Sequence, residues 1–124
     1  MPFRWSDYLT LAQDLIKRSD EAALRSAISR SYYAVFGTAT ETLTAKKISL
    51  KKTRRRKKLN SHEAVWYTYR SDSRTSWQKV GTDGDRLKRE RVRADYKPYA
   101  AISSALAGSV VARSNTLLKQ LQNL

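Results

Sequence analysis

The sequence predicts an all-α protein, an antiparallel bundle of four to five helices. Apolar residues recur at spacings of three and four over long stretches, which is the period of a helix that covers a core. The chain of 124 residues holds only four Gly and two Pro, so it signals few of the turns that link short strands. Its length suits one domain, residues 1–124, because domains most often have roughly 100–150 residues.

The first two expected helices lie at about residues 6–18 and 21–46. Ser19-Asp20 between them breaks the chain and can cap the second helix. Tyr32, Tyr33 and Phe36 widen the apolar stripe of the second helix, so we expect it to be central. The stripes consist of Trp5, Tyr8, Leu9, Ala12, Leu15 and Ile16, and of Leu24, Ala27, Ile28, Ser31, Val35, Ala39 and Leu43.

A basic loop at about 46–60 and three more helices complete the expected bundle. The third helix is expected to start near Ser61, which can cap it. Residues 71–84 are polar and turn-rich, apart from a short helical turn at 77–80. The fourth helix is expected to follow residues 83–85 and to end before Pro98. Inward-facing residues are Val65, Trp66 and Tyr69, then Leu87 and Ala94, and in the last helix Ile102, Ala105, Leu106, Ser109, Val110, Leu117 and Leu121.

Positive charge is concentrated in one segment. The formal net charge is +14, which points to polyanionic partners, nucleic acid first among them. Nine of the 25 basic residues and none of the 11 acidic ones lie within Lys46–Lys58. This segment is either a solvated loop or a nucleic-acid contact. The candidate nucleic-acid-binding residues are Lys51, Lys52, Arg54, Arg55, Arg56, Lys57 and Lys58, with Arg86, Arg89 and Arg93 on one face of the fourth helix.

Composition argues against several classes of protein. There is no Cys and a single His, so neither a thiolate site nor a metal site is expected, and no cofactor is indicated. The residues 81–84 lack the Lys-Ser/Thr of a phosphate-binding loop. No signal-like or membrane-spanning stretch is evident, so we expect a cytoplasmic protein without a membrane partner.

Three landmarks resemble the HEPN family (higher eukaryote and prokaryote nucleotide-binding). The run LRSAISRSYYAVF, residues 24–36, is similar to the second-helix signature, in which an Arg, a Tyr pair and a Phe recur in this order. Ser61-His62 opens a helix that ends in aromatics. RVRADY, residues 91–96, resembles an Arg-x-x-Ala-Asp-Tyr segment of some members. The resemblance covers nearly the whole chain.

The resemblance implies a short helical bundle, often a homodimer, in toxin–antitoxin or defence modules. It implies RNA as the ligand, and a nucleotidyltransferase-type protein as a possible cognate partner. The expected function is RNA binding, with metal-independent cleavage as its enzymatic form. The alternative is a catalytically silent bundle that binds a nucleotide, a nucleic acid or a partner protein. A plain structural domain with an incidental basic segment is the third interpretation.

The catalytic residues stay undecided at this stage. Nucleases of the family use an Arg followed a short distance later by a His within a helix. His62 is the only His, and five residues separate it from Arg56 across the basic run. Arg56, His62 and Arg91 are therefore the catalytic candidates. The plainer interpretation makes His62 a first-turn residue beside the Ser61 cap.

A polar cluster is expected between the second and fourth helices. Arg91 and Asp95 are four residues apart, in line with Leu87, so they face the bundle. Arg30 and Tyr33 of the second helix are expected to join them, because buried polar groups need partners. This cluster could fix helix register, or it could offer guanidinium to a phosphate.

Overall fold

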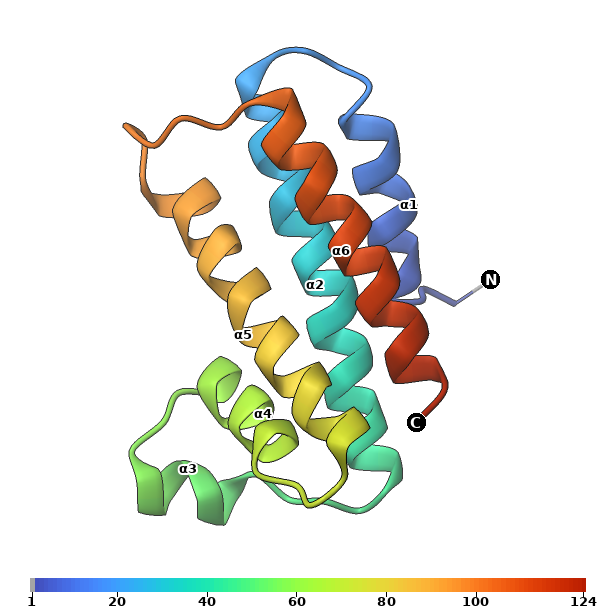
Figure 1. Ribbon diagram of the computed structural model, residues 1–124, viewed down its shortest axis with the longest axis vertical. Coiled ribbons are helices and arrows are strands. Elements are labelled where there is room, and N and C mark those ends of the chain that lie inside the picture. The colour runs from blue at the N-terminus through green and yellow to red at the C-terminus, as the bar shows by residue number, and fades with distance from the viewer. Residues whose placement is uncertain (1) are drawn as a thin grey trace.

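The computed structural model describes residues 2–124 and confirms an all-α bundle (Figure 1). The described residues form six helices, one more than the upper number expected, because part of the basic segment is helical. No helix within the described residues is both long and apolar enough to cross a membrane. The helices are α1 (Ser6–Leu15), α2 (Glu21–Ala45), α3 (Lys51–Lys57), α4 (Ser61–Arg70), α5 (Thr75–Tyr96) and α6 (Ser104–Gln122).

The central helix is α2, as predicted. Its first turn is capped by Asp20, whose carboxylate accepts the N–H of Ala23. It packs against α1, α5 and α6, and Figure 1 shows it running the length of the molecule among them. Ala27, Ala34 and Ala39 are fully buried on it. Small side chains at these positions let the neighbouring helices approach closely, so α2 can serve as the core of the bundle.

The helix α5 is longer than the sequence predicts. It begins at Thr75 rather than after residues 83–85, so the expected turn-rich stretch is wrong over most of its length. Gly81 and Gly84 lie where α5 passes α4. A Cβ on Gly81 would collide with the backbone of Arg70, and one on Gly84 would collide with the ring of Trp66. The glycines therefore permit close helix packing, which outweighs their weak helix propensity.

The helix α4 places aromatic side chains in the core. Its cap is Asn60 rather than Ser61, in a reciprocal pair of hydrogen bonds with Glu63. The predicted inward residues Val65, Trp66 and Tyr69 are all buried. Hydrogen bonds as well as packing therefore fix α4 on α2, since the hydroxyl of Tyr69 donates to the carbonyl of Ala39 at 2.7 Å.

The basic segment, Lys46–Lys58, is partly helical, so the prediction of a loop is wrong for α3. Lys58 takes a left-handed conformation after the helix, with φ 55°, and the N–H of Leu59 donates to the carbonyl of Arg54. Ile48 and Leu50 pack against the core. Lys and Arg are good helix formers. Apolar contacts on its N-terminal side and this C-terminal turn therefore hold a helix whose like charges repel each other.

Candidate functional site

His62 lies in the first turn of α4 against an aromatic wall from α2. Its ring stacks on Phe36 with centroids 4.0 Å apart and planes inclined by 11°. The Nδ1 atom lies 2.8 Å from the hydroxyl oxygen of Tyr32. The plainer interpretation, a first-turn residue beside a cap, therefore misses the inward contacts of this side chain.

A chain of hydrogen bonds favours one tautomer of His62. The indole Nε1–H of Trp66, which can only donate, reaches the Tyr32 oxygen at 2.9 Å. Nδ1 of His62 is the acceptor that the structure offers to the hydroxyl proton of Tyr32, so we assign this proton to that bond. With Nδ1 accepting, Nε2 carries the proton of the neutral ring. His62 thus has one ring nitrogen committed to the core and an N–H donor left for a ligand.

Arg91 brings a buried guanidinium to the same place from α5. The residue is 7% exposed, and its guanidinium carbon lies 5.3–5.8 Å from the ring centres of Tyr32, Tyr33 and Tyr96. It reaches Asp95 through one long hydrogen bond of 3.4 Å. Its Nε is buried and has no hydrogen-bond partner within the described residues. The positive charge is therefore held mainly by aromatic faces and is weakly compensated.

Burial and charge keep His62 neutral. Burial lowers the pKa of His62, and the positive charges of Arg91 and Lys88 lower it further. Burial also raises the pKa of Tyr32, so its hydroxyl keeps its proton. The site is therefore electropositive without an imidazolium, because its cations come from α5. We call Tyr32, Tyr33, His62, Trp66, Arg91 and Asp95 the His62 centre.

The predicted polar cluster forms without Arg30. Asp95 meets Arg91, whose guanidinium lies over the ring of Tyr33, between the helices expected. Arg30 is exposed, with its guanidinium 5.1 Å from the ring centre of Tyr8 in α1, so its predicted place in the network is wrong. One position on a helix turns a side chain by about 100°. The preceding residue, Ser29, takes the place instead and donates to Asp95 at 3.2 Å.

The cationic side chain near His62 is not Arg56, which the sequence spacing suggested, but Arg91 of α5. Arg56 is exposed on α3, whereas the cations whose charge acts on His62 are Arg91 and Lys88 of α5. The spacing of Arg56 and His62 in the sequence therefore does not describe the pairing in space. Of the three catalytic candidates, His62 and Arg91 are brought together.

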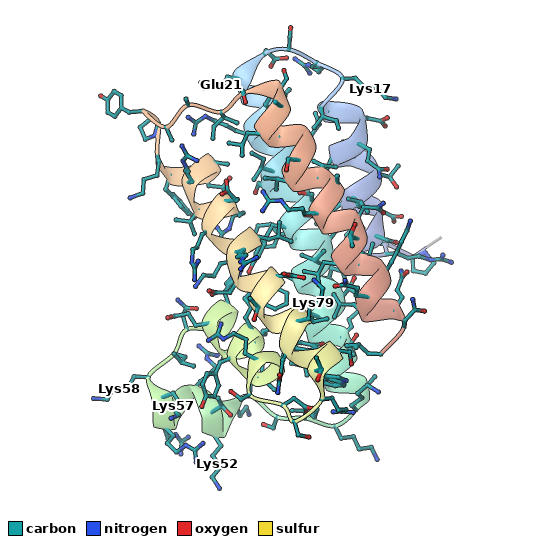
Figure 2. The ribbon with its side chains drawn as sticks, viewed as in Figure 1. Lys17, Glu21, Lys52, Lys57, Lys58 and Lys79 are labelled. Atoms are coloured by element: carbon teal, nitrogen blue, oxygen red, sulfur yellow. The ribbon has the colours of Figure 1, made fainter. Side chains whose placement is uncertain are left out.

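The basic segment forms a separate, exposed surface. Its Lys and Arg side chains are all solvent-exposed, and Lys52 and Lys58 project outward from the end of the molecule in Figure 2. A shallow hollow of about 320 Å³ lies among Lys51, Arg54, Arg55 and Leu59. The predicted arginines of α5 are also exposed, which keeps them available to a polyanion. They are Arg86, Arg89 and Arg93.

Three residues of the site region were not singled out from the sequence. Trp66 was expected only as core, Lys88 was not considered, and Arg25 had no assigned role. Arg25 donates to backbone carbonyls at the end of α5, at 2.8 Å to Ala94 and 2.8 Å to Ala100. An Arg beside the buried stripe of α2 was the available signal, because a half-buried guanidinium needs several acceptors.

Within residues 2–124 no group of three or more His, Asp or Glu side chains is arranged to hold a metal ion. In the comparisons with known proteins, no protein-family model and no curated protein matches this chain.

Proposed function

We propose that this protein is an RNA-binding helical bundle of the HEPN type, and that the His62 centre holds a phosphodiester of the RNA. The observation that carries the proposal is the buried guanidinium of Arg91 beside a neutral imidazole from another helix. A weakly compensated Arg gains charge-assisted hydrogen bonds when a phosphate arrives. Asp95, at 3.4 Å, is a poor substitute for such an anion.

His62 supports the same proposal through its tautomer. Because Tyr32 donates to Nδ1, the remaining N–H of the neutral ring is a donor that a phosphate oxygen can accept. The stacking on Phe36 fixes the ring plane before any ligand binds. The donor therefore needs little reorganisation on binding, which favours affinity.

The basic segment supplies the second part of the proposal. Exposed Lys and Arg neutralise phosphates and release condensed counterions, a contribution that does not depend on sequence. In this arrangement α3 attracts the polyanion, and the His62 centre fixes one phosphodiester. HEPN membership rests on the three sequence landmarks described above.

Binding to a labelled single-stranded RNA, followed by fluorescence anisotropy at low salt, tests the proposal. We expect Arg91→Gln to weaken binding roughly tenfold, the equivalent of about 1.4 kcal/mol. Arg56→Gln is the matched control, since it removes the same charge from an exposed position, and its effect should be much smaller. Circular dichroism checks that both variants fold. Equal affinities for parent and Arg91→Gln would refute the role of the centre.

Metal-independent RNA cleavage is the second candidate, and the lowered pKa of His62 favours it. A neutral imidazole at pH 7 can accept a proton, as a general base must. The proton of the ring would first have to move from Nε2 to Nδ1, so that Nε2 can act as the base. The Tyr32 oxygen would then accept a hydrogen bond from Nδ1–H. Incubation with total RNA in the presence of a chelator decides. Fragments produced by the parent and not by His62→Ala support cleavage. If the RNA stays intact, binding is the only one of the two functions that remains.

Two partners follow from the HEPN resemblance. One is a second copy of the chain in a homodimer, and the other is a nucleotidyltransferase-type protein of a toxin–antitoxin or defence module. Light scattering at micromolar concentrations tests the homodimer, for which a mass near 14.2 kDa would count against it. Co-expression with a nucleotidyltransferase encoded beside this chain tests the second partner.

A further inference from the structure

A groove lies beside the His62 centre on the outer face of α5. Its volume is about 760 Å³, within the range of small-molecule sites. One wall is the α5 face that carries Val92, and the other is the connection to α6 that carries Tyr99. The lining is mainly carbon, while the surrounding cations are Lys88, Arg89, Arg93 and Lys97. An apolar floor with a cationic rim suits a ligand with a flat apolar part and an anionic part.

Arg25 holds the second wall in place. Its guanidinium donates to the carbonyls of Ala94 and Lys97, at 2.8 and 3.1 Å, and to those of Pro98 and Ala100, at 3.3 and 2.8 Å. These bonds run from the last turn of α5 into the connection. The backbone of this wall is thus held before a ligand arrives, and binding has to order mainly the side chain of Tyr99.

Tyr99 offers a free aromatic face at this wall. It is 101% exposed, whereas the other large exposed hydrophobic side chains are 44–67% exposed. An aromatic ring beside cations is the combination on which RNA-binding proteins stack unpaired bases. Solvent exposure on this scale leaves the ring available for such stacking.

The charge at the groove is graded. Asp85 forms ion pairs with Lys88 and Arg89, at 3.6 and 2.6 Å, and so compensates one end of the rim. Arg93 and Lys97 form no ion pair within the described residues and leave the other end positive. The groove and the His62 centre share one stretch of α5, because Lys88 and Val92 of the groove each lie three residues before Arg91 and Asp95 of the centre.

We infer that this groove is a subsite for one unpaired nucleotide of single-stranded RNA, next to the phosphodiester at the His62 centre. The base packs against Val92 and Tyr99, and its phosphate lies at Arg93 and Lys97. A duplex does not fit this description, because its bases are paired and stacked within the helix. The inference rests on the proposed function and adds the class of RNA and the place of one base.

Anisotropy titrations with three probes test the subsite: a single-stranded oligoribonucleotide, its duplex, and an abasic oligomer of equal length. We expect Tyr99→Ala to weaken binding of the single strand roughly tenfold. Its affinity for the abasic oligomer should be unchanged, because that oligomer has no base to stack. Tyr99 contacts solvent on all sides, so the variant should fold as the parent does. Ultraviolet crosslinking of a thiouridine-labelled single strand should map to the peptide that contains Tyr99.

A charge-matched pair of variants isolates the position of the cations. The double variant Arg93→Ser, Lys97→Ser should weaken binding of both the single strand and the abasic oligomer. The double variant Arg113→Ser, Lys119→Ser removes one Arg and one Lys from exposed positions on α6 and should have a much smaller effect.

Two outcomes are distinguishable. If the parent binds the single strand and Tyr99→Ala binds it equally well, or if the duplex binds as tightly, the subsite is wrong and the proposed function stands. If the parent binds no RNA, both are wrong.

Discussion

The His62 centre and the basic segment both concentrate positive charge, but in opposite surroundings. Arg91 is 7% exposed among tyrosine rings, whereas every Lys and Arg of the segment is exposed to solvent. A buried charge is screened little by salt and is fixed in direction, while exposed charges are screened within about 10 Å. Under the proposed function, the centre recognises the geometry of one phosphate, and the segment recognises only the density of charge.

The same contrast separates stability from binding. The His62 centre joins α2, α4 and α5 through packing and hydrogen bonds, so substitutions there should change the stability of the fold. The segment contributes no side chain of Lys or Arg to the core, so substitutions there should change only binding. The four predictions below test this division, from the largest expected effect to the smallest.

Replacing Gly84 with Ala should cost about 3 kcal/mol of unfolding free energy, because the added methyl collides with the ring of Trp66. That ring cannot move freely, since its N–H is bonded to Tyr32. Gly108→Ala is the control. A Cβ there meets no atom within 4 Å, and it should stabilise α6 by up to about 1 kcal/mol. Denaturant unfolding measures both, and equal effects would mean that α5 and α4 do not pack as described.

Removing the hydroxyl of Tyr32 should cost about 2 kcal/mol. Tyr32→Phe leaves the indole N–H of Trp66 without its acceptor and Nδ1 of His62 without its donor. Tyr33→Phe is matched in chemistry and keeps the ring that lies over Arg91, so its cost should be clearly smaller. Thermal and denaturant unfolding measure the stability of the two variants. Equal stabilities would contradict the chain of hydrogen bonds from Trp66 through Tyr32 to His62.

Stability should fall in mild acid because of His62. Its pKa in the folded protein is lowered from the ordinary value of 6.5, chiefly by burial and then by Arg91 and Lys88. A lowered pKa means that the stabilising contribution is fully present above about pH 6.5 and is lost as pH falls through the folded-state pKa. Protonation would also turn Nδ1 from an acceptor into a donor against Tyr32.

Melting temperatures measured from about pH 7.5 down to about pH 5.5 check this expectation. His62→Gln cannot titrate, so its curve should be flatter than that of the parent over this range. Parallel curves for the two proteins would assign the pH dependence to other groups.

Changing Arg54, Arg55, Arg56, Lys57 and Lys58 together to Ser should alter unfolding free energy by only about 0.5 kcal/mol, since these side chains are exposed. Binding should still weaken for all sequences alike. If all five contact a single strand, the slope of log K against log salt should flatten by roughly 3.5. An unchanged slope would remove the basic segment from the binding surface.

Much of the bundle follows from local sequence. The stripe of α2 predicted a central helix, and Asp20 predicted its start, because both features depend on neighbours one turn away. The concentration of charge in Lys46–Lys58 needed only counting. The HEPN landmarks gave the expected function, which stays a proposal with the tests described above.

The start of α5 and the membership of the polar cluster depended on tertiary packing. Gly81 and Gly84 suit a turn in isolation, and only the approach of α4 makes them helix-packing positions. Arg30 and Ser29 are adjacent, and the rotation of α2 against α1 and α5 decides which of them meets Asp95.

The sequence by itself determined the central helix α2 with its start and the place where positive charge gathers, since both follow from the chain within a turn or two. Only the tertiary structure decided that His62 shares the Tyr32 ring with Arg91, while Arg56 is exposed on α3. His62 and Arg91 lie on α4 and α5, and the relative position of two helices is set by how their side chains interdigitate. Here Gly81 and Gly84 of α5 let Arg70 and Trp66 of α4 approach, and no spacing within one helix reports this contact between two helices.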